Sequence, residues 1–326
     1  TSIWILPTMN PDGLETAERY NANGFDLNRS FPKYRDDFIS PVFRGLVPTY
    51  SDYEPEVAAV MKWTIENSFV LSANLHGGDL LVNYPYDDDS LPSGADAPTP
   101  DDGLFQDISR RYSVHNSPMW NSTEFADGIS NGNAWYTAKG SMIDWNYRYA
   151  ACNEVTMELS KTKRPAASTL GALWNDNRES MLSYAEACHI GVRGIVTDGG
   201  VKGPMWAEVR VDGNEHRVYT DRDVGDYHRM LLPGTYTLAF GAPGYFTRTI
   251  ENVEVGSGEA TRVDVELNQP DVNRDGVVDA VDLQLTINTL LGTETRYACD
   301  FDGGGVSSTD LQLLINVLLG SLEIEM

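Results

Sequence analysis

An internal repeat near the C-terminal end constrains the fold of this chain more than any other feature. Residues 282–292 recur as residues 310–320, with nine of eleven positions identical. Each copy has the pattern of an apolar helix and follows a loop rich in Asp and Gly. The repeat therefore predicts a duplicated loop–helix module over residues 269–326.

The first of these loops has the spacing of a calcium site. Oxygen-bearing side chains and one glycine stand at loop positions 1, 3, 5, 6, 9 and 12, namely Asp271, Asn273, Asp275, Gly276, Asp279 and Asp282. Calcium takes several oxygen ligands, and this spacing wraps side-chain oxygens and the Val277 carbonyl around one point. The alternative interpretation is an Asp-rich turn that caps the next helix.

The second loop is the weaker calcium candidate. Its acidic residues are Asp300, Asp302 and Asp310. The loop is one residue shorter before its final Asp, and Gly304 stands where the first copy has Asp275. We expect it to bind calcium weakly or not at all.

Length and charge limit the remaining possibilities. A chain of 326 residues is expected to form two or three domains. Its 48 acidic and 24 basic residues give a net charge of −24, which disfavours binding to nucleic acid because phosphates would be repelled. No apolar run approaches the roughly 18 residues of a membrane span.

The hydrophobic pattern divides the chain into three regions. Residues 1–187 mix strand and helix patterns and predict an α/β domain with a mixed sheet, whereas residues 188–268 alternate with a period of two and predict a small β-sandwich. Residues 269–326 form the third region. In the first region we expect strands at residues 3–6, 69–75 and 155–159, and helices at residues 54–67 and 173–187.

The N-terminal residues suggest a chain that continues from something longer. Residues 1–6 have the pattern of a half-buried strand, and neither an initiator Met nor a signal peptide precedes them. We expect the sequence to be the remainder of a longer protein.

Four polar residues of the first region are candidates for chemistry. Arg29, beside Asn28, either pairs with a nearby Asp or clamps a substrate carboxylate, since its fork matches a carboxylate bidentately. His76 ends an apolar strand before two glycines and is either structural or a metal ligand. Glu158 lies on a strand face that either meets solvent or aims a general base into a cleft.

The order of motifs in residues 1–267 resembles the zinc metallocarboxypeptidases, specifically the regulatory branch with carboxypeptidases D, E and N. The motifs occupy residues 6–13, 25–32, 71–78, 83–88, 134–136, 142–147 and 154–159. The resemblance implies a carboxypeptidase-like domain followed by a transthyretin-like β-sandwich. It also implies a secreted enzyme that removes C-terminal Lys or Arg from peptides or proteins.

The resemblance implies a role for each matching residue. His76 matches the third zinc ligand, and Glu158 matches the glutamate that takes a proton from water. Arg19 matches the arginine that stabilises the oxyanion. The remaining roles all concern the substrate and fall on Asn28, Arg29, Asp87, Tyr136 and Ile143.

Those substrate roles differ from one another. Asn28 and Arg29 match the pair that grips the terminal carboxylate, and Tyr136 matches the mobile tyrosine that closes over substrate. Asp87 matches the acid that selects Lys or Arg. Ile143 stands where this branch has glutamine and instead resembles members that prefer apolar side chains.

The zinc ligands are incomplete in this sequence. The family takes two ligands from an H-x-x-E segment ahead of the opening strand, and none of the five histidines has Glu three residues later. We expect two further ligands upstream of Thr1, so the domain is interpreted as N-terminally truncated and inactive as it stands. The alternative is a non-catalytic protein that binds peptide ends.

Residues 271–320 resemble a dockerin, the calcium-dependent module that docks onto cohesins in secreted bacterial assemblies. A cohesin-like partner is the implied consequence. The third hypothesis is therefore an assembly protein that acts through calcium-dependent docking, which is compatible with a peptidase in the same chain.

Overall fold

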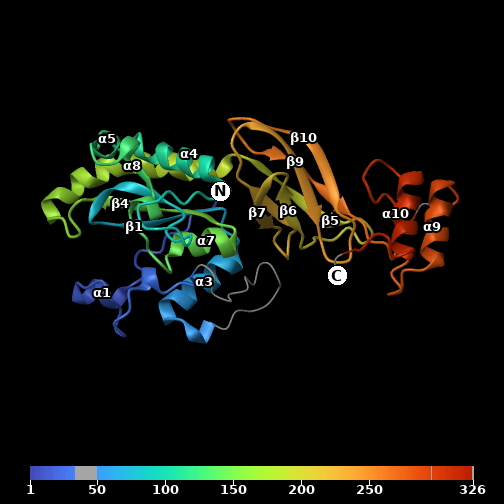
Figure 1. Ribbon diagram of the computed structural model, residues 1–326, viewed down its shortest axis with the longest axis horizontal. Helices are drawn as coiled ribbons and strands as arrows, with labels where there is room; N and C mark the ends of the chain where they lie inside the picture. Colours follow the sequence, from blue (N-terminus) through green and yellow to red (C-terminus); the bar gives the residue numbers. More distant parts are fainter. Residues whose placement is uncertain (34–49, 295, 325–326) are drawn as a thin grey trace. The chain divides into compact units, whose positions relative to one another are not determined.

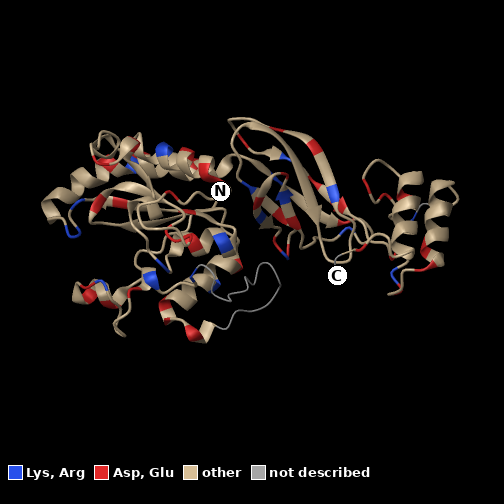
Figure 2. Cartoon of the chain, in the orientation of Figure 1, with Lys and Arg blue, Asp and Glu red and all other residues tan. Residues whose placement is uncertain are grey.

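The structure is a computed structural model and describes residues 1–33, 50–294 and 296–324. The chain divides into two compact units, Thr1–Cys188 and His189–Met326 (Figure 1). Acidic side chains occur on both units, in keeping with the net charge (Figure 2). A helix with the length and hydropathy of a bilayer span is absent from the part of the chain that the structure describes.

The first unit is built on a mixed four-stranded sheet with the order β1-β4-β2-β3. Strand β4 pairs in parallel with β1 and antiparallel with β2, and β2 pairs in parallel with β3. The strands are β1 (Leu71–His76), β2 (Asp79–Tyr84), β3 (Ile129–Asn131) and β4 (Asn153–Ser160). The mixed sheet expected from the sequence is therefore confirmed.

Helices cover both sides of this sheet. Figure 1 shows α4 and α8 along one side and α3 and α7 on the other. The helices are α1 (Pro11–Thr16), α3 (Pro55–Asn67), α4 (Asp102–Ser113), α5 (Ser117–Trp120), α6 (Gly132–Trp135), α7 (Met142–Ala150) and α8 (Leu170–Glu186).

The apolar residues of α3 recur at helical spacing and lie on its buried side. Val57, Val60 and Met61 pack with Leu27 and Trp145 in one core cluster, and Ile65 lies against it. Burial of such side chains contributes about 1.5–3 kcal/mol each to folding. This cluster anchors the polar residues that follow Leu27.

The strand expected at residues 3–6 is wrong for this structure. These residues have no regular secondary structure, and Trp4 and Ile5 are 60% and 81% exposed. An isolated strand leaves its backbone hydrogen bonds unmade, so an alternating pattern alone does not form one. The first helix, α1, begins at Pro11, with Asn10 as its N-cap.

Two elements bury polar side chains. On α8 the polar Asn177 and Ser180 face the interior, while Trp174 and Leu182 are exposed. Asn177 is buried because its side-chain oxygen accepts hydrogen bonds from Tyr112 and Asn116. Along β4 the face with Glu154, Thr156 and Glu158 is also buried, in a sheet that has helices on both sides (Figure 1).

The second unit contains two small sheets. One has the order β10-β9-β6-β7, and in the other β5 pairs with β8, β11 and β12. The rings of Tyr227 and Phe240 meet between the sheets with centroids 5.5 Å apart. The strands are β5 (Val192–Asp198), β6 (Glu208–Val211), β7 (Asn214–Tyr219), β8 (Asp226–Arg229), β9 (Gly234–Gly241), β10 (Arg248–Val255), β11 (Thr261–Arg262) and β12 (Val265–Leu267).

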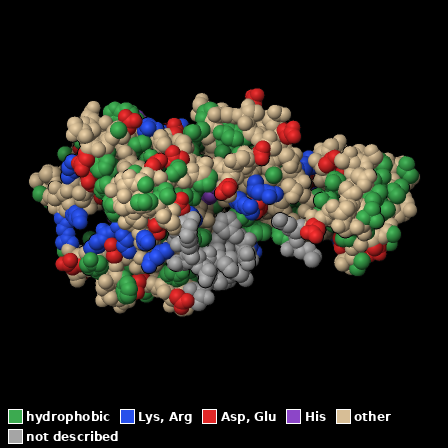
Figure 3. Space-filling view, in the orientation of Figure 1, with side chains coloured by type: hydrophobic (Ala, Val, Ile, Leu, Met, Phe, Trp, Pro, Cys, Tyr) green, Lys and Arg blue, Asp and Glu red, His purple; other side chains and the backbone are tan. Residues whose placement is uncertain are grey.

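The repeat at the C-terminal end forms two helices, α9 (Ala280–Leu290) and α10 (Ser308–Leu318). Each helix begins with a capping box, which satisfies two amide hydrogens reciprocally. Their exposed side carries apolar residues, visible as a green area over the helix pair in Figure 3. Leu291 and Leu319 are the most exposed of them.

The helix pair is joined directly to the sandwich. Phe246, between β9 and β10, is buried in the core of the helix pair beside Phe301. Arg274 of the first loop pairs with Asp198 at the end of β5. Arg248 of β10 donates a 3.2 Å hydrogen bond to the carbonyl of Gly303 in the second loop.

A glycine makes room for each of these two arginines. A Cβ at Gly200 would collide with the Arg274 guanidinium, and a Cβ at Gly303 would collide with that of Arg248. Both loops are therefore seated on the sandwich by reciprocal arginine–glycine contacts.

Candidate active site

His76 and Glu158 stand opposite each other at one edge of the mixed sheet. They are partners in the parallel register of β1 and β4, and both lie toward the carboxyl ends of their strands. That edge is where open α/β sheets place their ligand sites. The sheet register therefore brings together two residues that are 82 positions apart in the sequence.

His76 is held as a neutral imidazole. Burial, together with the positive charges of Arg19 and Arg29, lowers the pKa of His76 to about 4, against the raising effect of the Asp26 charge. Its Nε2 lies 3.5 Å from the Asn28 side-chain nitrogen. A neutral ring offers a nitrogen lone pair, which is the form that binds a metal.

Glu158 has the surroundings of a proton acceptor. It is 8% exposed, and its Oε2 has no hydrogen-bond partner among the residues the structure describes. Burial raises the pKa of Glu158, the charge of Asp79 adds to this, and the charges of Arg19 and Lys163 oppose it. A buried carboxylate with a raised pKa is a stronger base than an exposed one.

Lys163 is a neighbour of this site that the sequence analysis did not single out. A Cβ at Gly78 would come 2.9 Å from the Lys163 Cε. The glycine pair after His76 was the available signal, because it leaves space for a chain to approach the strand end.

The expected carboxylate clamp forms the short 3₁₀ turn η1 (Leu27–Arg29). The side chain of Asp26 caps this turn by accepting the amide hydrogen of Asn28 at 3.2 Å. The Arg29 guanidinium donates to the Asn28 carbonyl at 2.6 Å and to the Tyr136 hydroxyl at 3.5 Å. The Arg29 and Tyr136 side chains thus lie together.

Within the described residues, no carboxylate forms an ion pair with Arg29. The nearby acid, Asp26, pairs instead with Arg19, with 2.6 Å between Nε and Oδ2. The interpretation of Arg29 as half of a local ion pair is therefore wrong. Its fork remains available for the carboxylate of a bound molecule, and Arg19 lies close enough for its charge to act on both His76 and Glu158.

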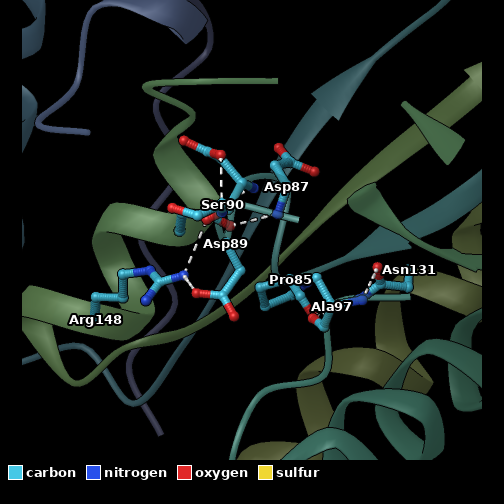
Figure 4. Close-up of polar contacts among 9 residues, drawn as sticks. Pro85, Asp87, Asp89, Ser90, Ala97, Asn131 and Arg148 are labelled. Atoms are coloured by element: carbon cyan, nitrogen blue, oxygen red, sulfur yellow. Dashed lines mark hydrogen bonds and ion pairs between the residues drawn. The ribbon is translucent and has the colours of Figure 1, made fainter. Parts of the chain in front are cut away.

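Asp87 and Ile143 are both enclosed. Asp87 is 4% exposed and accepts a 2.9 Å hydrogen bond from Asn83, while Ile143 on α7 is fully buried. A Cβ at Gly132 would collide with the Asp87 carboxylate, so this glycine allows the close approach. Burial raises the pKa of Asp87 to about 6, against the lowering effect of hydrogen bonds and of the Arg29 charge. Figure 4 shows the loop that carries it.

A second buried carboxyl lies four residues before Glu158 on the same strand. Glu154 accepts hydrogen bonds from Ser72 and Asn146, both of them neutral. Burial raises the pKa of Glu154 to about 7, although these hydrogen bonds oppose the shift. The protein therefore folds more readily around the protonated form.

We expect this carboxyl to make stability fall as pH rises from about 4.5 to about 7. Over that range the unfolded chain has already lost the proton that the folded chain retains, and the total effect is on the order of 3 kcal/mol. Urea unfolding of the wild type and of Glu154→Gln at pH 5 and pH 8 measures it. The variant should lose this dependence, whereas Glu66→Gln on α3 should keep it. If Glu154→Gln had the same urea unfolding midpoint as the wild type at both pH 5 and pH 8, the prediction would be contradicted.

The described residues do not complete a catalytic zinc site. Such a site takes three protein ligands. Among the residues described, the only convergent set of metal-ligating side chains is Asp300, Asp302 and Asp310, and none joins His76. The assignment of His76 as a zinc ligand therefore stays a prediction.

The calcium loops share one backbone arrangement. In the first loop both carboxylate oxygens of Asp282 accept loop amides, those of Val272, Asn273 and Asp279. In the second loop Asp310 accepts the corresponding amides of Phe301, Asp302 and Ser307. The carboxylate at the end of each loop therefore closes it in the same way.

The two loops differ in how their acids converge. Ligand atoms of Asp300, Asp302 and Asp310 lie within 4.8 Å of one another. Among the described residues the first loop has no such set, although in both loops the acids accept loop amides, Asp271 those of Asp275 and Gly276 and Asp300 that of Gly303. Oxygen donors of these kinds fit calcium, and the rank order of the two loops stays a prediction.

We expect Asp275→Ala to lower calcium affinity at the first loop by about tenfold, because it removes one anionic ligand. Calcium titration by isothermal calorimetry measures the effect. Asp264→Ala, which removes an exposed acid of the sandwich, is the control and should leave the titration unaltered. A calcium titration unchanged by Asp275→Ala would remove this residue from the site.

Comparisons with known proteins agree with the three regions. A family model described as "Zinc carboxypeptidase" matches residues 1–180, one described as "Carboxypeptidase regulatory-like domain" matches residues 191–268, and one described as "Dockerin type I domain" matches residues 269–319.

Two curated relatives illustrate the likeness. The carboxypeptidase N catalytic chain of Homo sapiens is 41% identical over 299 residues, which cover 82% of this chain and 65% of that relative. Carboxypeptidase D of Rattus norvegicus is 40% identical over 301 residues, which cover 83% of this chain. The chain spans about a fifth of that second relative, 21% of its length.

Proposed function

Because this chain belongs to the zinc carboxypeptidase family, we propose that its first unit binds the C-terminal end of a peptide and removes a Lys or Arg from it. The Arg29 fork carries this proposal. Arg29 donates to the Asn28 carbonyl and the Tyr136 hydroxyl and has no carboxylate partner among the described residues, and the Asn28 side chain lies 3.5 Å from His76. A free guanidinium fork in that place suits the terminal carboxylate that only a chain end presents.

Each residue has one part in the proposed reaction. Arg29 and Asn28 bind the terminal carboxylate, and Tyr136 covers the bound end. Glu158 takes a proton from the attacking water, which its unpartnered oxygen is suited to accept. Arg19 places a positive charge near the oxygen on which negative charge develops.

The specificity follows from charge. The Asp87 carboxylate would pair with the ammonium of Lys or the guanidinium of Arg, and buried pairing of this kind discriminates strongly against neutral side chains. Ile143 contributes an apolar wall for the aliphatic part of that side chain. In this family zinc polarises the scissile carbonyl and activates water, and His76 is the described residue suited to hold it.

A pair of peptides tests the proposal. One ends in Arg with a free carboxylate and the other carries the same Arg as an amide. We expect the free acid to bind at least about tenfold more tightly in calorimetry, since the amide lacks the charge that Arg29 pairs with. Equal affinities would overturn it. Selective binding without release of arginine in zinc-containing buffer would favour a peptide-end binder over a peptidase.

We also propose calcium-dependent docking through residues 269–319, because the acids of the second loop converge and the paired helices expose apolar side chains. A cohesin-like protein is the proposed partner, and an extracellular location is the corresponding proposal. Loss of partner binding on chelation of calcium, with recovery on its return, is the expected result. Binding that persists in chelator would contradict it.

A further inference from the structure

Helix α7 contacts the loop that follows β2 and carries Asp87. We call residues 85–97 the Asp87 loop, and α7 binds its backbone. The Asp144 carboxylate accepts two amide hydrogens, from Asp87 at 2.8 Å and from Asp88 at 2.9 Å. One turn later Arg148 donates to the Asp88 carbonyl at 3.0 Å and to the Asp89 carboxylate at 3.1 Å (Figure 4). Two side chains of one helix therefore hold three consecutive residues.

Arg148 also covers the residue that precedes Asp87. Its guanidinium carbon lies 3.4 Å from the centre of the Tyr86 ring, a cation–π contact. Its side chain is 13% exposed, so these contacts are largely shielded from water. Shielded contacts to a charged group are stronger than exposed ones.

The residues on both sides of Asp87 in this loop, Pro85 and Ala97, are fixed from β3. The Asn131 side chain donates to the carbonyls of Pro85 at 3.2 Å and Ala97 at 3.0 Å, and accepts the Ala97 amide at 3.1 Å (Figure 4). The ends of the loop thus depend on the sheet, whereas the part with Asp87 depends on α7.

The same helix is bonded to the carboxylate clamp. The amide of Met142, the first residue of α7, donates to the Asn28 side-chain oxygen at 2.9 Å. Met142 at the start of α7 therefore touches Asn28, while Asp144 in the same turn and Arg148 one turn later hold the Asp87 loop. A helix is stiff over nine residues, so it fixes the separation between these two groups.

We propose that Asp144 and Arg148 are positioning residues that set the preference for a basic C-terminal residue by holding Asp87 at a fixed separation from Asn28 and Arg29. The inference rests on the proposed function of the first unit and assigns the specificity to residues beyond the pocket. Neither residue needs to touch the substrate. A displacement of Asp87 by about 1 Å is enough to weaken a buried charge pair severely.

The experiment compares two peptides that differ only in the terminal side chain, one ending in Arg and the other in citrulline. Citrulline has nearly the same shape but no charge, so the ratio of the two dissociation constants reports the Asp87 contact alone. Calorimetry in a Glu158→Gln background prevents consumption of the peptides. The substitutions are Arg148→Met and Asp144→Asn, with Arg148→Lys as the variant that retains the cation.

The matched control is Arg111→Met. Arg111 lies one turn from Asp107 on α4, as Arg148 lies one turn from Asp144 on α7, but its ion pair is with Asp107 on its own helix and not with the Asp87 loop. Near-ultraviolet circular dichroism of each variant verifies that the tertiary structure is kept.

We expect Arg148→Met and Asp144→Asn to lower the Arg-to-citrulline preference about tenfold, and Arg148→Lys to recover part of it. Affinity for the citrulline peptide should stay within about twofold, because Arg29 still binds its carboxylate. A merely structural role would weaken both peptides equally.

Two results would overturn the inference in different ways. If the unsubstituted protein has the preference and the variants keep it unchanged, whether or not they bind both peptides equally more weakly, the positioning role alone is overturned. Equal affinity of the unsubstituted protein for both peptides overturns the Lys/Arg assignment together with it.

Discussion

In a version of the protein with a complete set of zinc ligands, Glu158→Gln is expected to lower peptide hydrolysis by about 10³-fold while leaving the dissociation constant for an Arg-ended peptide within about threefold. A positioned base typically contributes 10²–10⁴ to the rate, and Gln cannot accept the proton from water. The shape of the side chain is kept, so the binding residues Asn28 and Arg29 are undisturbed. Rates come from arginine release, and affinity comes from calorimetry.

Glu154→Gln is the control for this experiment. It makes the same exchange on the same buried face of β4, four residues before Glu158. The hydrogen-bond partners of Glu154 are Ser72 and Asn146, not Asn28, Arg29 or His76. Its rate should remain near that of the unsubstituted protein. Comparable turnover in Glu158→Gln would remove the general-base role from Glu158.

Asp87→Asn is expected to reduce the preference for Arg over citrulline by about 100-fold. Removal of one charge from a buried pair costs roughly 2–5 kcal/mol, and about 2.7 kcal/mol corresponds to 100-fold. The amide can still accept the hydrogen bond from Asn83, so the loop should keep its conformation. The neighbouring Asp88→Asn, which removes a charge without facing the proposed pocket position, is the control.

The preference should also fall on acidification. Burial raises the pKa of Asp87 to about 6, so its carboxyl becomes neutral as pH drops from 7.5 to 5. The wild-type ratio should follow that titration, and the ratio of Asp87→Asn should not. A ratio that is independent of pH, or one that survives the substitution, would move specificity to another residue.

The mixed sheet and its main helix were predictable from periodicity, but the buried side of several elements was not. Alternation in β4 shows that Glu154 and Glu158 share a face. It does not show that another layer covers that face, which depends on the helices on both sides of the sheet (Figure 1). The same limit explains α8, where Asn177 is interior only because Tyr112 and Asn116 supply partners from other elements.

The candidate site was predictable in its residues and not in its supports. Asn28, Arg29, His76 and Glu158 stood out because they lie in polar or glycine-rich segments where a core is not expected. Arg148 gave no such signal, since a lone arginine on a helix usually faces solvent. Its role depends on a loop that is 59 to 60 positions away in the sequence.

The segment at residues 3–6 shows the opposite error. Its sequence has a strand pattern, yet a strand is stable only when a neighbour receives its hydrogen bonds. Strand β1 is the edge of the described sheet, and the exposed Ile3, Trp4 and Ile5 lie in a segment without regular structure. Pattern alone does not supply a neighbour.

The seating of Arg274 over Gly200 and of Arg248 over Gly303 has a mechanical consequence. Only residues 269 and 270 separate Asn268, which donates to the carbonyl of Asp300, from the first calcium loop. The root-mean-square end-to-end distance of a flexible linker of n residues is about 5–6 Å times the square root of n. These contacts remove that freedom here. A partner bound to α9 and α10 would therefore set the direction in which the sandwich points as well as its distance. The contacts hold the helix pair and the sandwich together rigidly, so a rotation of the helix pair would rotate the sandwich with it.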